Sequence, residues 1–319
     1  MSAAQSRVGT PFGNVYEPAH FGCRGGGRGG LGGGIIKMLV TGRLKIDGTI
    51  GCDGSSGQAG ASGGGSGGSI RIETNLMQGY GQITVNGGDG KRDYRNYHGG
   101  GGAGGRIAVY FYSNRTYSGT FEAFGGNSGG NMGTAGGAGT IFLYHRFHHH
   151  RTLIVSNKDR SPFKPRDQPI SSYSDMSLVS GTTWLLTTST ASQFVQDMNY
   201  HFEELQIYGR AHLALHELSI NKSSSLKFRH MIGDRSGTVH IGSNQFMDLN
   251  RSEIDLPFNV HVYSGGYLGL APKTTVHGIN LHIDGVIENI QNLLLHHAGV
   301  LYLNEGSRTG NTHRKNDFK

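Results

Sequence analysis

The chain has 319 residues, 55 of them glycine, and a formal net charge of +7. The glycines keep no strict period of three, and no proline occurs between Pro18 and Pro162, which excludes collagen. Simple disorder is disfavoured because the glycine runs alternate with β-branched and aromatic stretches. The charge is dispersed, which disfavours nucleic acid as a partner; the densest basic cluster is Lys91, Arg92 and Arg95, with Asp89 and Asp93 interleaved.

The first residues, 1–24, are predicted to form an N-terminal extension. They hold no apolar core segment of the kind that a signal peptide requires. No apolar run in the chain approaches the roughly 20 residues of a membrane-spanning helix. We therefore expect no membrane span. Either the protein is cytosolic, or the chain is part of a longer secreted protein whose leader lies elsewhere, and the repeats described below favour the second.

Residues 25–147 form a glycine-rich region with an internal repeat. Four segments align: GLGGGIIKMLV, GGGSGGSIRIET, GGGGAGGRIAVYF and AGGAGTIFLYH. Each is followed by a second short strand pattern: GRLKIDGT, GQITVNGG, GTFEAFGG and RTLIVSNK. The repeat predicts that Ile35, Ile70, Ile107 and Ile141 occupy equivalent positions. In the second strands we expect these side chains to point inward: Leu44 and Ile46, Ile83 and Val85, Phe121 and Ala123, Leu153 and Val155.

Each repeat offers two short strands, which are too few to bury a core alone. Stacking equivalent strands in parallel would bury a continuous ladder of isoleucines. The glycine runs, such as 63–65 and 99–102, permit positive φ and close backbone approach. Whether these runs pack against each other or are poorly ordered stays open at this point.

The remaining chain divides into three parts. Residues 148–177, with Pro162 and Pro165, are predicted to be a basic linker, and residues 311–319 a basic tail. Residues 178–310 contain short alternating strands separated by turn signals, without helical spacing. The whole sequence therefore predicts an all-β repeat solenoid, with a right-handed parallel β-helix favoured over a β-sandwich.

The segments GGGSGGSIRIET, GQITVNGGDG and GGGGAGGRIAVYF resemble glycine-rich repeats of very large, mostly uncharacterised extracellular proteins of aquatic invertebrates and protists. The resemblance covers about residues 25–145. It implies a location outside the cell and a structural or adhesive role, and it transfers no catalytic residue.

Two cysteines and three sequons bear on that location. Cys23 and Cys52 lie in glycine-rich connections of the first repeats, where a disulfide and two free thiols are both compatible with the sequence. Asn114, Asn221 and Asn250 are candidate N-glycosylation sites. Their number matches chance, so they do not establish secretion.

No pattern in the chain identifies a catalytic, cofactor or metal site. Residues 87–92 lack the hydroxyl residue and the helix of a phosphate-binding loop. Residues 24–30 resemble a short arginine-glycine RNA-binding segment, but with only two arginines. The cluster His145, His148, His149 and His150 favours adventitious metal binding. The histidines at 240, 261 and 282 are expected to form an outward ladder, and the following carboxylates form no recognisable catalytic pair: Glu203, Glu204, Asp234, Asp248, Asp255 and Asp284.

The sequence thus favours a non-enzymatic structural or adhesive segment of an extracellular protein, with other matrix proteins or glycans as partners and no cofactor. The first alternative is a carbohydrate-binding or polysaccharide-cleaving β-helix. The second is RNA binding through residues 24–30.

Overall fold

The computed structural model describes a protein whose regular elements, over the described residues, are all β-strands. The all-β prediction is therefore confirmed. The described ranges are 13–113, 116–130, 133–160, 183–185, 199–215, 224–242, 245–249, 253–263, 266–270, 273–278, 280–283, 286–288, 292–296, 300–303, 308–311 and 314–316.

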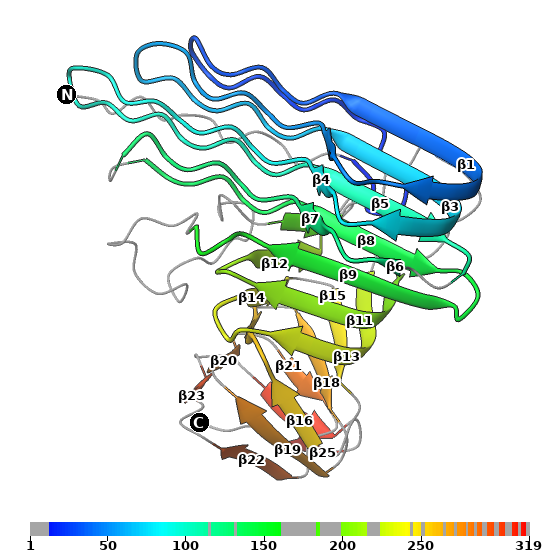
Figure 1. Ribbon diagram of the computed structural model, residues 1–319. Helices are drawn as coiled ribbons and strands as arrows, with labels where there is room; N and C mark the ends of the chain where they lie inside the picture. Colours follow the sequence, from blue (N-terminus) through cyan, green and yellow to red (C-terminus); the bar gives the residue numbers. More distant parts are fainter. Residues whose placement is uncertain are drawn as a thin grey trace.

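One large sheet of 13 strands extends along the molecule (Figure 1). Its strands follow one another in chain order across the sheet, and β6 (Thr116–Tyr117) pairs beside β3. The path contains β1 (Ile35–Lys45), β3 (Ser69–Gly79), β5 (Arg106–Phe111), β8 (Thr140–His145), β9 (His150–Ser156), β11 (Asn199–Tyr208), β13 (Ser224–Gly233), β15 (Gln245–Leu249), β18 (Tyr267–Leu270), β21 (Val286–Glu288), β24 (Arg308–Asn311) and β25 (Arg314–Asn316).

Three smaller sheets run alongside, again with parallel neighbours in chain order. The first contains β2 (Thr49–Gly51), β4 (Gln82–Thr84) and β7 (Thr120–Glu122). The second contains β10 (Thr183–Leu185), β12 (His212–Leu215), β14 (Thr238–Ile241), β17 (Asn259–Val262), β20 (Asn280–Ile283) and β23 (Val300–Leu303). The third contains β16 (Glu253–Leu256), β19 (Lys273–Gly278) and β22 (Asn292–His296).

The predicted isoleucine ladder is present, with one position corrected. Ile70 pairs with Ile107, and Ile107 with Ile141, in parallel register, and all three are buried. In the first repeat, however, Ile36 pairs with Ile70, while Ile35 pairs with Ser69 and is 36% exposed. The prediction for Ile35 was therefore wrong by one residue. Two adjacent isoleucines follow the first glycine run, so the sequence does not show which one points inward.

The pairing of the second strands follows the prediction only in the two middle repeats. Ile83 pairs with Phe121 as expected, and the residue of the first repeat aligned with them is Ile50. Leu44 instead continues the long first strand, where it pairs with Met77. The inward direction is confirmed by burial for these residues: Ile46, Ile83, Val85, Ala123, Leu153 and Val155.

The strand direction reverses between β8 and β9, which pair antiparallel through a tight turn. The core changes face at the same point. Ile141 belongs to the cluster of the glycine-rich section, whereas its neighbour Phe142 and Leu153 of β9 belong to the cluster of the second section. Strand direction and core face therefore reverse together at this turn.

The structure adds detail to three of the predicted segments. In the predicted N-terminal extension, Val15 is completely buried in the core cluster of the second section. The predicted linker 148–177 begins with β9, a strand inside the large sheet, and its residues 161–177 lie outside the described residues. In the predicted tail, β25 pairs antiparallel with β24.

Candidate functional site

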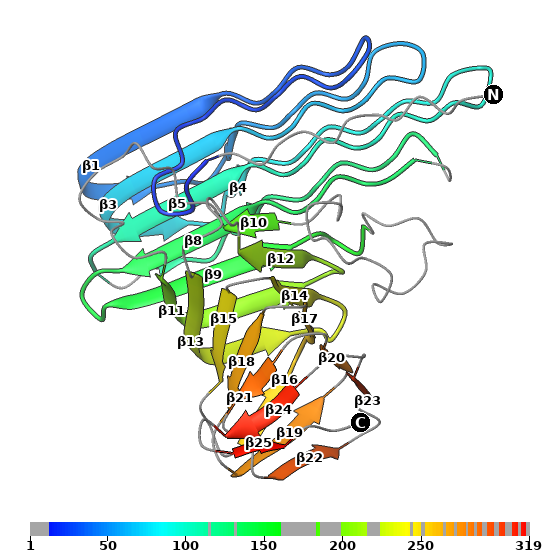
Figure 2. The ribbon, with the colours of Figure 1, turned by 180° about the vertical axis from the view of Figure 1, so that it is seen from behind.

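The most distinctive feature is a set of four glycine-rich connections, residues 22–34, 51–68, 85–105 and 123–139, here called the glycine arms. Each arm runs outward from the small sheet or the N-terminal segment and returns to the next strand of the large sheet; in the fourth arm, residues 131–132 lie outside the described residues. Figures 1 and 2 show the arms as long, extended limbs that lie side by side and project beyond the strands.

The arms are held by backbone hydrogen bonds that point in three directions in turn. In the returning limb of the second arm, successive N–H groups donate to a neighbouring arm, to the outgoing limb and to another arm, with N···O distances of 2.8–3.0 Å. The donor and acceptor pairs are Gly64–Gly100, Gly65–Ser55, Ser66–Cys23, Gly67–Ala103 and Gly68–Cys52. The direction of the N–H groups thus repeats every three residues. A polyproline II helix has three residues per turn and no hydrogen bonds within one limb, whereas a β-strand repeats every two residues.

The glycines are required because the limbs approach too closely for side chains. A Cβ atom on Gly64 would lie 1.8 Å from the carbonyl oxygen of Gly88, and one on Gly67 would lie 1.9 Å from that of Val85. Neither glycine has a positive φ. Close approach, rather than the positive φ also considered from the sequence, explains these runs, and the open question is resolved in favour of packed arms.

Polar side chains complete the hydrogen bonding at the edge of the arms. Asp53 Oδ1 accepts from the N–H of Asn86, and Asn86 Oδ1 accepts from that of Phe124. Asn157 is fully buried and lies beside the last arm, where its side chain makes hydrogen bonds of the kind that a neighbouring arm makes elsewhere. Its side chain accepts from the N–H of Gly125 at 2.8 Å and donates to the carbonyl of Gly136 at 3.0 Å. Asn157 follows β9, so the cap of the arms is part of the second section.

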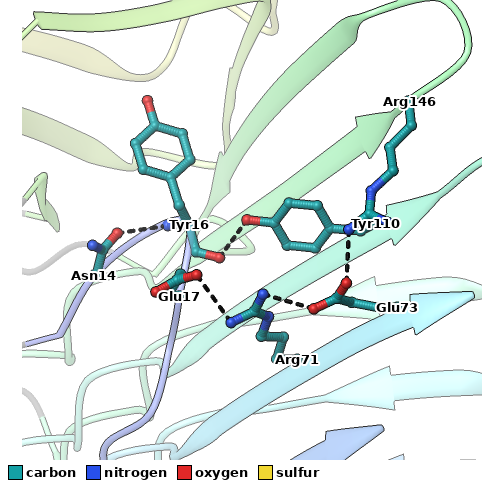
Figure 3. A network of polar contacts seen from close by, with 7 residues as sticks. All are labelled: Asn14, Tyr16, Glu17, Arg71, Glu73, Tyr110 and Arg146. Carbon is teal, nitrogen blue, oxygen red and sulfur yellow. Dashed lines mark hydrogen bonds and ion pairs between the residues drawn. The ribbon is translucent and has the colours of Figure 1, made fainter. Parts of the chain in front are cut away.

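A second feature, here called the clamp, holds the N-terminal segment 13–23 against one face of β3, β5 and β8. This face is opposite to the one that carries the buried Ile70, Ile107 and Ile141. The Tyr16 ring meets Phe142 edge-on at 5.0 Å and stacks near Phe202 at 6.0 Å. The Tyr110 hydroxyl donates to the carbonyl oxygen of Tyr16 at 2.6 Å (Figure 3). The segment thereby joins strands on both sides of the β8–β9 reversal.

Charged groups complete the clamp. Arg71 binds Glu17 and Glu73, and Arg146 binds the other oxygen of Glu73 at 2.7 Å (Figure 3). Both guanidinium groups also lie near the Tyr110 ring, at 5.4 and 5.3 Å from its centre. Burial would raise the pKa of the Glu73 carboxyl, but the hydrogen bonds and charges of the two arginines outweigh it and lower that pKa. Burial also raises the pKa of the Tyr110 hydroxyl, which stays a donor at neutral pH.

A third feature is a set of buried histidines in the second section, which corrects the predicted outward ladder. His240 and His261 pair in register on β14 and β17 and are 1% and 2% exposed. His212 Nδ1 lies 3.0 Å from His240 Nε2, and His240 Nδ1 lies 3.1 Å from the Tyr263 hydroxyl. Burial lowers the pKa of His212 to about 3 and that of His240 well below its usual value, so both are neutral at pH 7.

The other predicted histidine cluster lies at the β8–β9 turn. The His145 and His148 rings stack at 4.4 Å, and the Tyr144 hydroxyl is 3.2 Å from His149 Nδ1. Within the described residues no group of three or more histidine, cysteine or acidic side chains has the arrangement of a metal site. The contacts at this turn are ring stacking and hydrogen bonding.

The two cysteines are free thiols, so the disulfide that the sequence left open is not formed in this structure. Cys23 is exposed and Cys52 is buried. The returning limb of the first arm packs against both, since a Cβ atom on Gly32 would be 2.8 Å from Cys23 N and one on Gly33 would be 1.9 Å from Cys52 O. The three candidate glycosylation sites, Asn114, Asn221 and Asn250, lie outside the described residues.

The arginine-glycine segment 24–30 is part of the first arm. The N–H of Gly25 donates to the carbonyl of Gly30, and Arg24 Nε donates to the carbonyl of Gly29. An arginine-glycine RNA-binding segment works as a flexible chain, whereas this one has a fixed backbone.

The described carboxylates of the enzyme alternative all take part in structural contacts. Glu203 binds Arg151 at 3.0 Å, and Asp234 accepts from the N–H groups of Gly209 and Ser236. Burial would raise the pKa of the Glu203 carboxyl, but hydrogen bonds from Arg151 outweigh it and lower that pKa. The others bind Gln206 (Glu204), Lys227 (Asp248) and Arg235 (Asp255), and Asp284 lies outside the described residues.

Comparison with known proteins gave no matching family model, no matching curated protein and no matching solved structure. In the part of the chain that the structure describes, no helix is long and apolar enough to span a membrane.

Proposed function

We propose that the chain is a structural or adhesive module of an extracellular assembly, built as a repeat solenoid with right-handed parallel β-helical coils. Support for the coils comes from the parallel ladders, in which strands of the large and small sheets alternate along the chain and pair in chain order. Support for one hand throughout comes from the joint reversal of strand direction and core face at β8–β9, because crossovers between parallel strands strongly prefer one hand.

The observation that carries the structural role is the backbone bonding of the glycine arms. The arms are rich in glycine, so they bury little apolar surface, and many of their N–H groups instead donate to the opposite limb or to neighbouring arms. The pattern joins each arm to the next and extends the stack well beyond the sheets. Such an extension makes a stiff spacer, since polyproline II limbs are long for their number of residues, at about 3.1 Å each.

The extracellular location is supported by the resemblance of residues 25–145 to glycine-rich repeats of extracellular proteins. An antibody against the full chain tests it on source cells. We expect labelling of intact, non-permeabilised cells and recovery of the protein in the extracted cell coat or matrix. Labelling that requires permeabilisation would contradict the extracellular role.

The structural role has a separate test in single-molecule stretching of the full chain. We expect the residues of the glycine arms to lengthen only together with the strands that they join, because their hydrogen bonds must break first. Arms that extend at negligible force before the strands unfold would contradict the proposal.

A further inference from the structure

The tip of the third arm differs from the tips of the first two arms. Residues 26–29 and 58–61, at the tips of the first two arms, are glycine and alanine apart from Arg28 and Gln58. Residues 91–98, here called the tip loop, read KRDYRNYH. This loop contains the densest basic cluster of the sequence and two of the most exposed aromatic side chains, Tyr94 at 87% and Tyr97 at 62%.

The tip loop is ordered by its own contacts. Asp93 Oδ1 accepts from the N–H groups of Arg95 and Tyr97, at 2.9 and 2.8 Å, and the N–H of Asp93 donates to the carbonyl of Tyr97 at 3.0 Å. Asn96 closes the turn with a φ of 66°, a conformation that asparagine tolerates better than most residues. Two exposed tyrosines are thereby held on a fixed backbone.

The base of the loop is fixed to neighbouring arms. The N–H of Lys91 donates to the carbonyl of Ser62 at 2.8 Å, and Lys91 Nζ donates to the carbonyl of Gln58 at 2.8 Å. A ligand that binds the tip therefore meets a surface that is already in place, which reduces the entropy lost on binding.

The charges of the tip loop favour an anionic ligand. Lys91, Arg92 and Arg95 are exposed, and the Arg95 guanidinium lies 5.2 Å from the centre of the Tyr94 ring. The acidic neighbours accept backbone hydrogen bonds, Asp93 as described above and Asp89 from the N–H of Asn127 at 2.6 Å. With three cations against two carboxylates, residues 89–98 have a net charge of +1, and the surface that a ligand meets is basic and aromatic.

The size of the loop decides between classes of anionic ligand. A standard protein–protein interface uses about 20–30 residues on each side, many more than this loop offers. Nucleic acid requires a basic stripe that follows many phosphates, whereas these cations are confined to one tip. A few sugar rings match the footprint, because their C–H groups pack on the negative faces of aromatic rings while cations bind their acidic substituents.

We propose that the tip loop binds an anionic polysaccharide, a sugar chain that carries carboxylate or sulfate groups. Tyr94 and Tyr97 stack on the sugar rings, and Arg92 and Arg95 bind the acidic groups. The assignment rests on the proposed adhesive function and names its ligand class.

The test is direct binding of the full chain to four probes: heparin for sulfate, polygalacturonate for carboxylate, dextran as a neutral sugar chain and single-stranded oligo-dT as a nucleic acid. Two variants address the loop, Tyr94→Ala with Tyr97→Ala and Arg92→Gln with Arg95→Gln. The matched control, Tyr80→Ala with Arg28→Gln, removes an exposed tyrosine (71%) and an exposed arginine outside the loop. Melting temperatures verify that all variants are folded.

We expect binding to heparin, polygalacturonate or both, weakened by salt, and an affinity roughly tenfold lower in either loop variant but unchanged in the control. Which of the two probes binds identifies the acidic group. The proposal is overturned if neither anionic probe binds, if the loop variants bind like the wild type, if dextran binds equally well, or if oligo-dT binds more tightly than both. Binding retained in the loop variants would remove only the tip assignment, and cell labelling would still decide the extracellular role.

Discussion

At the scale of single residues, this protein depends on the absence of side chains as much as on their presence. Gly64 lies against the carbonyl group of Gly88, so its missing Cβ is what allows a hydrogen-bonded neighbour. Gly34, at the end of the first arm, has no atom within 4 Å of the place where a Cβ would be. The same residue type therefore has different roles at two positions of similar sequence context.

This contrast gives a matched pair of variants. Gly64→Ala should destabilise the protein by roughly 1–3 kcal/mol, because backbone atoms must move and arm hydrogen bonds must lengthen. Gly34→Ala should be close to neutral, since the added methyl group is unobstructed and restricts the unfolded chain. Urea unfolding of both variants measures the difference. Equal losses would show that the arms do not pack as described.

The buried histidines predict a loss of stability in mild acid. In the unfolded chain they take up protons as the pH falls through about 6.5, whereas folded His212 does so only at about pH 3. The unfolded state therefore binds more protons, and the free energy of unfolding falls by up to about 1.4 kcal/mol per pH unit for each such histidine between these values. Above about pH 6.5 the histidines are neutral in both states, and the free energy of unfolding loses nothing through them.

Urea unfolding between about pH 7 and about pH 5 tests this, before carboxylates such as Glu73 contribute. His212→Asn should give a shallower dependence on pH. His230→Gln, at an exposed position of β13, should keep the wild-type dependence. A wild-type stability that is constant over this range would contradict neutral, buried histidines.

At the scale of strands, both faces of β5 are covered by other residues, so a mutation on either face disturbs packing. Ile107 points into the isoleucine ladder and is fully buried. Arg106 points to the opposite face, where it is also largely covered and donates to Thr140 at 3.0 Å. Burial lowers the pKa of the Arg106 guanidinium to about 10. A substitution of Arg106 would therefore also disturb a covered face of β5.

An aspartate introduced at a buried position of the ladder should reduce stability far more than one introduced at an exposed position. Ile107→Asp should cost about 4 kcal/mol or more, because it leaves an unpaired carboxylate in the core. Lys37→Asp, on the exposed face of β1, should change stability by less than about 1 kcal/mol. Thermal unfolding compares them, and similar losses would refute the assigned faces.

From the contacts of the clamp we predict that removal of the Tyr16 ring releases the N-terminal segment. Tyr16→Ala removes the aromatic contacts with Phe142 and Phe202 and should cost about 3–5 kcal/mol. Glu17→Gln, at a half-exposed ion pair, should cost less than about 1 kcal/mol. Limited proteolysis should cut within residues 13–23 only in Tyr16→Ala. Rapid cleavage there in the wild type would show that the segment is not held.

At the scale of the whole molecule, one sheet joins two sections whose cores lie on its opposite faces. Phe142 and Ile141, adjacent on β8, belong to different core clusters. Asn157 and the clamp add connections across the same boundary, because each joins a glycine-rich element to a strand beyond the reversal. We expect the glycine arms to share the stability of the sheets to which they are bonded.

Hydrogen exchange tests this expectation directly. Amides of residues 63–68 and of Gly99, Gly101, Gly102, Gly104 and Gly105 should exchange about as slowly as those of β3 and β5, because they donate to backbone carbonyl groups within and between the arms. Residues 94–96, in the exposed turn of the tip loop, provide the internal control and should exchange much faster. Fast exchange throughout the arms would mean that they are ordinary flexible loops.

Much of the architecture follows from the sequence by itself. The alternation of apolar residues determines an all-β chain, and the repeat spacing determines the pairing of Ile70, Ile107 and Ile141, because side chains on stacked strands must match in register. Only the tertiary structure decided three other features. The arms pack in three directions because their acceptors come from distant limbs, which no local pattern shows. RTLIVSNK reads as one more repeat strand, yet as β9 it lies in the large sheet, where it pairs antiparallel with β8 and parallel with β11. His240 alternates with apolar residues like a solvated side chain, and its burial depends on what the fold places over it.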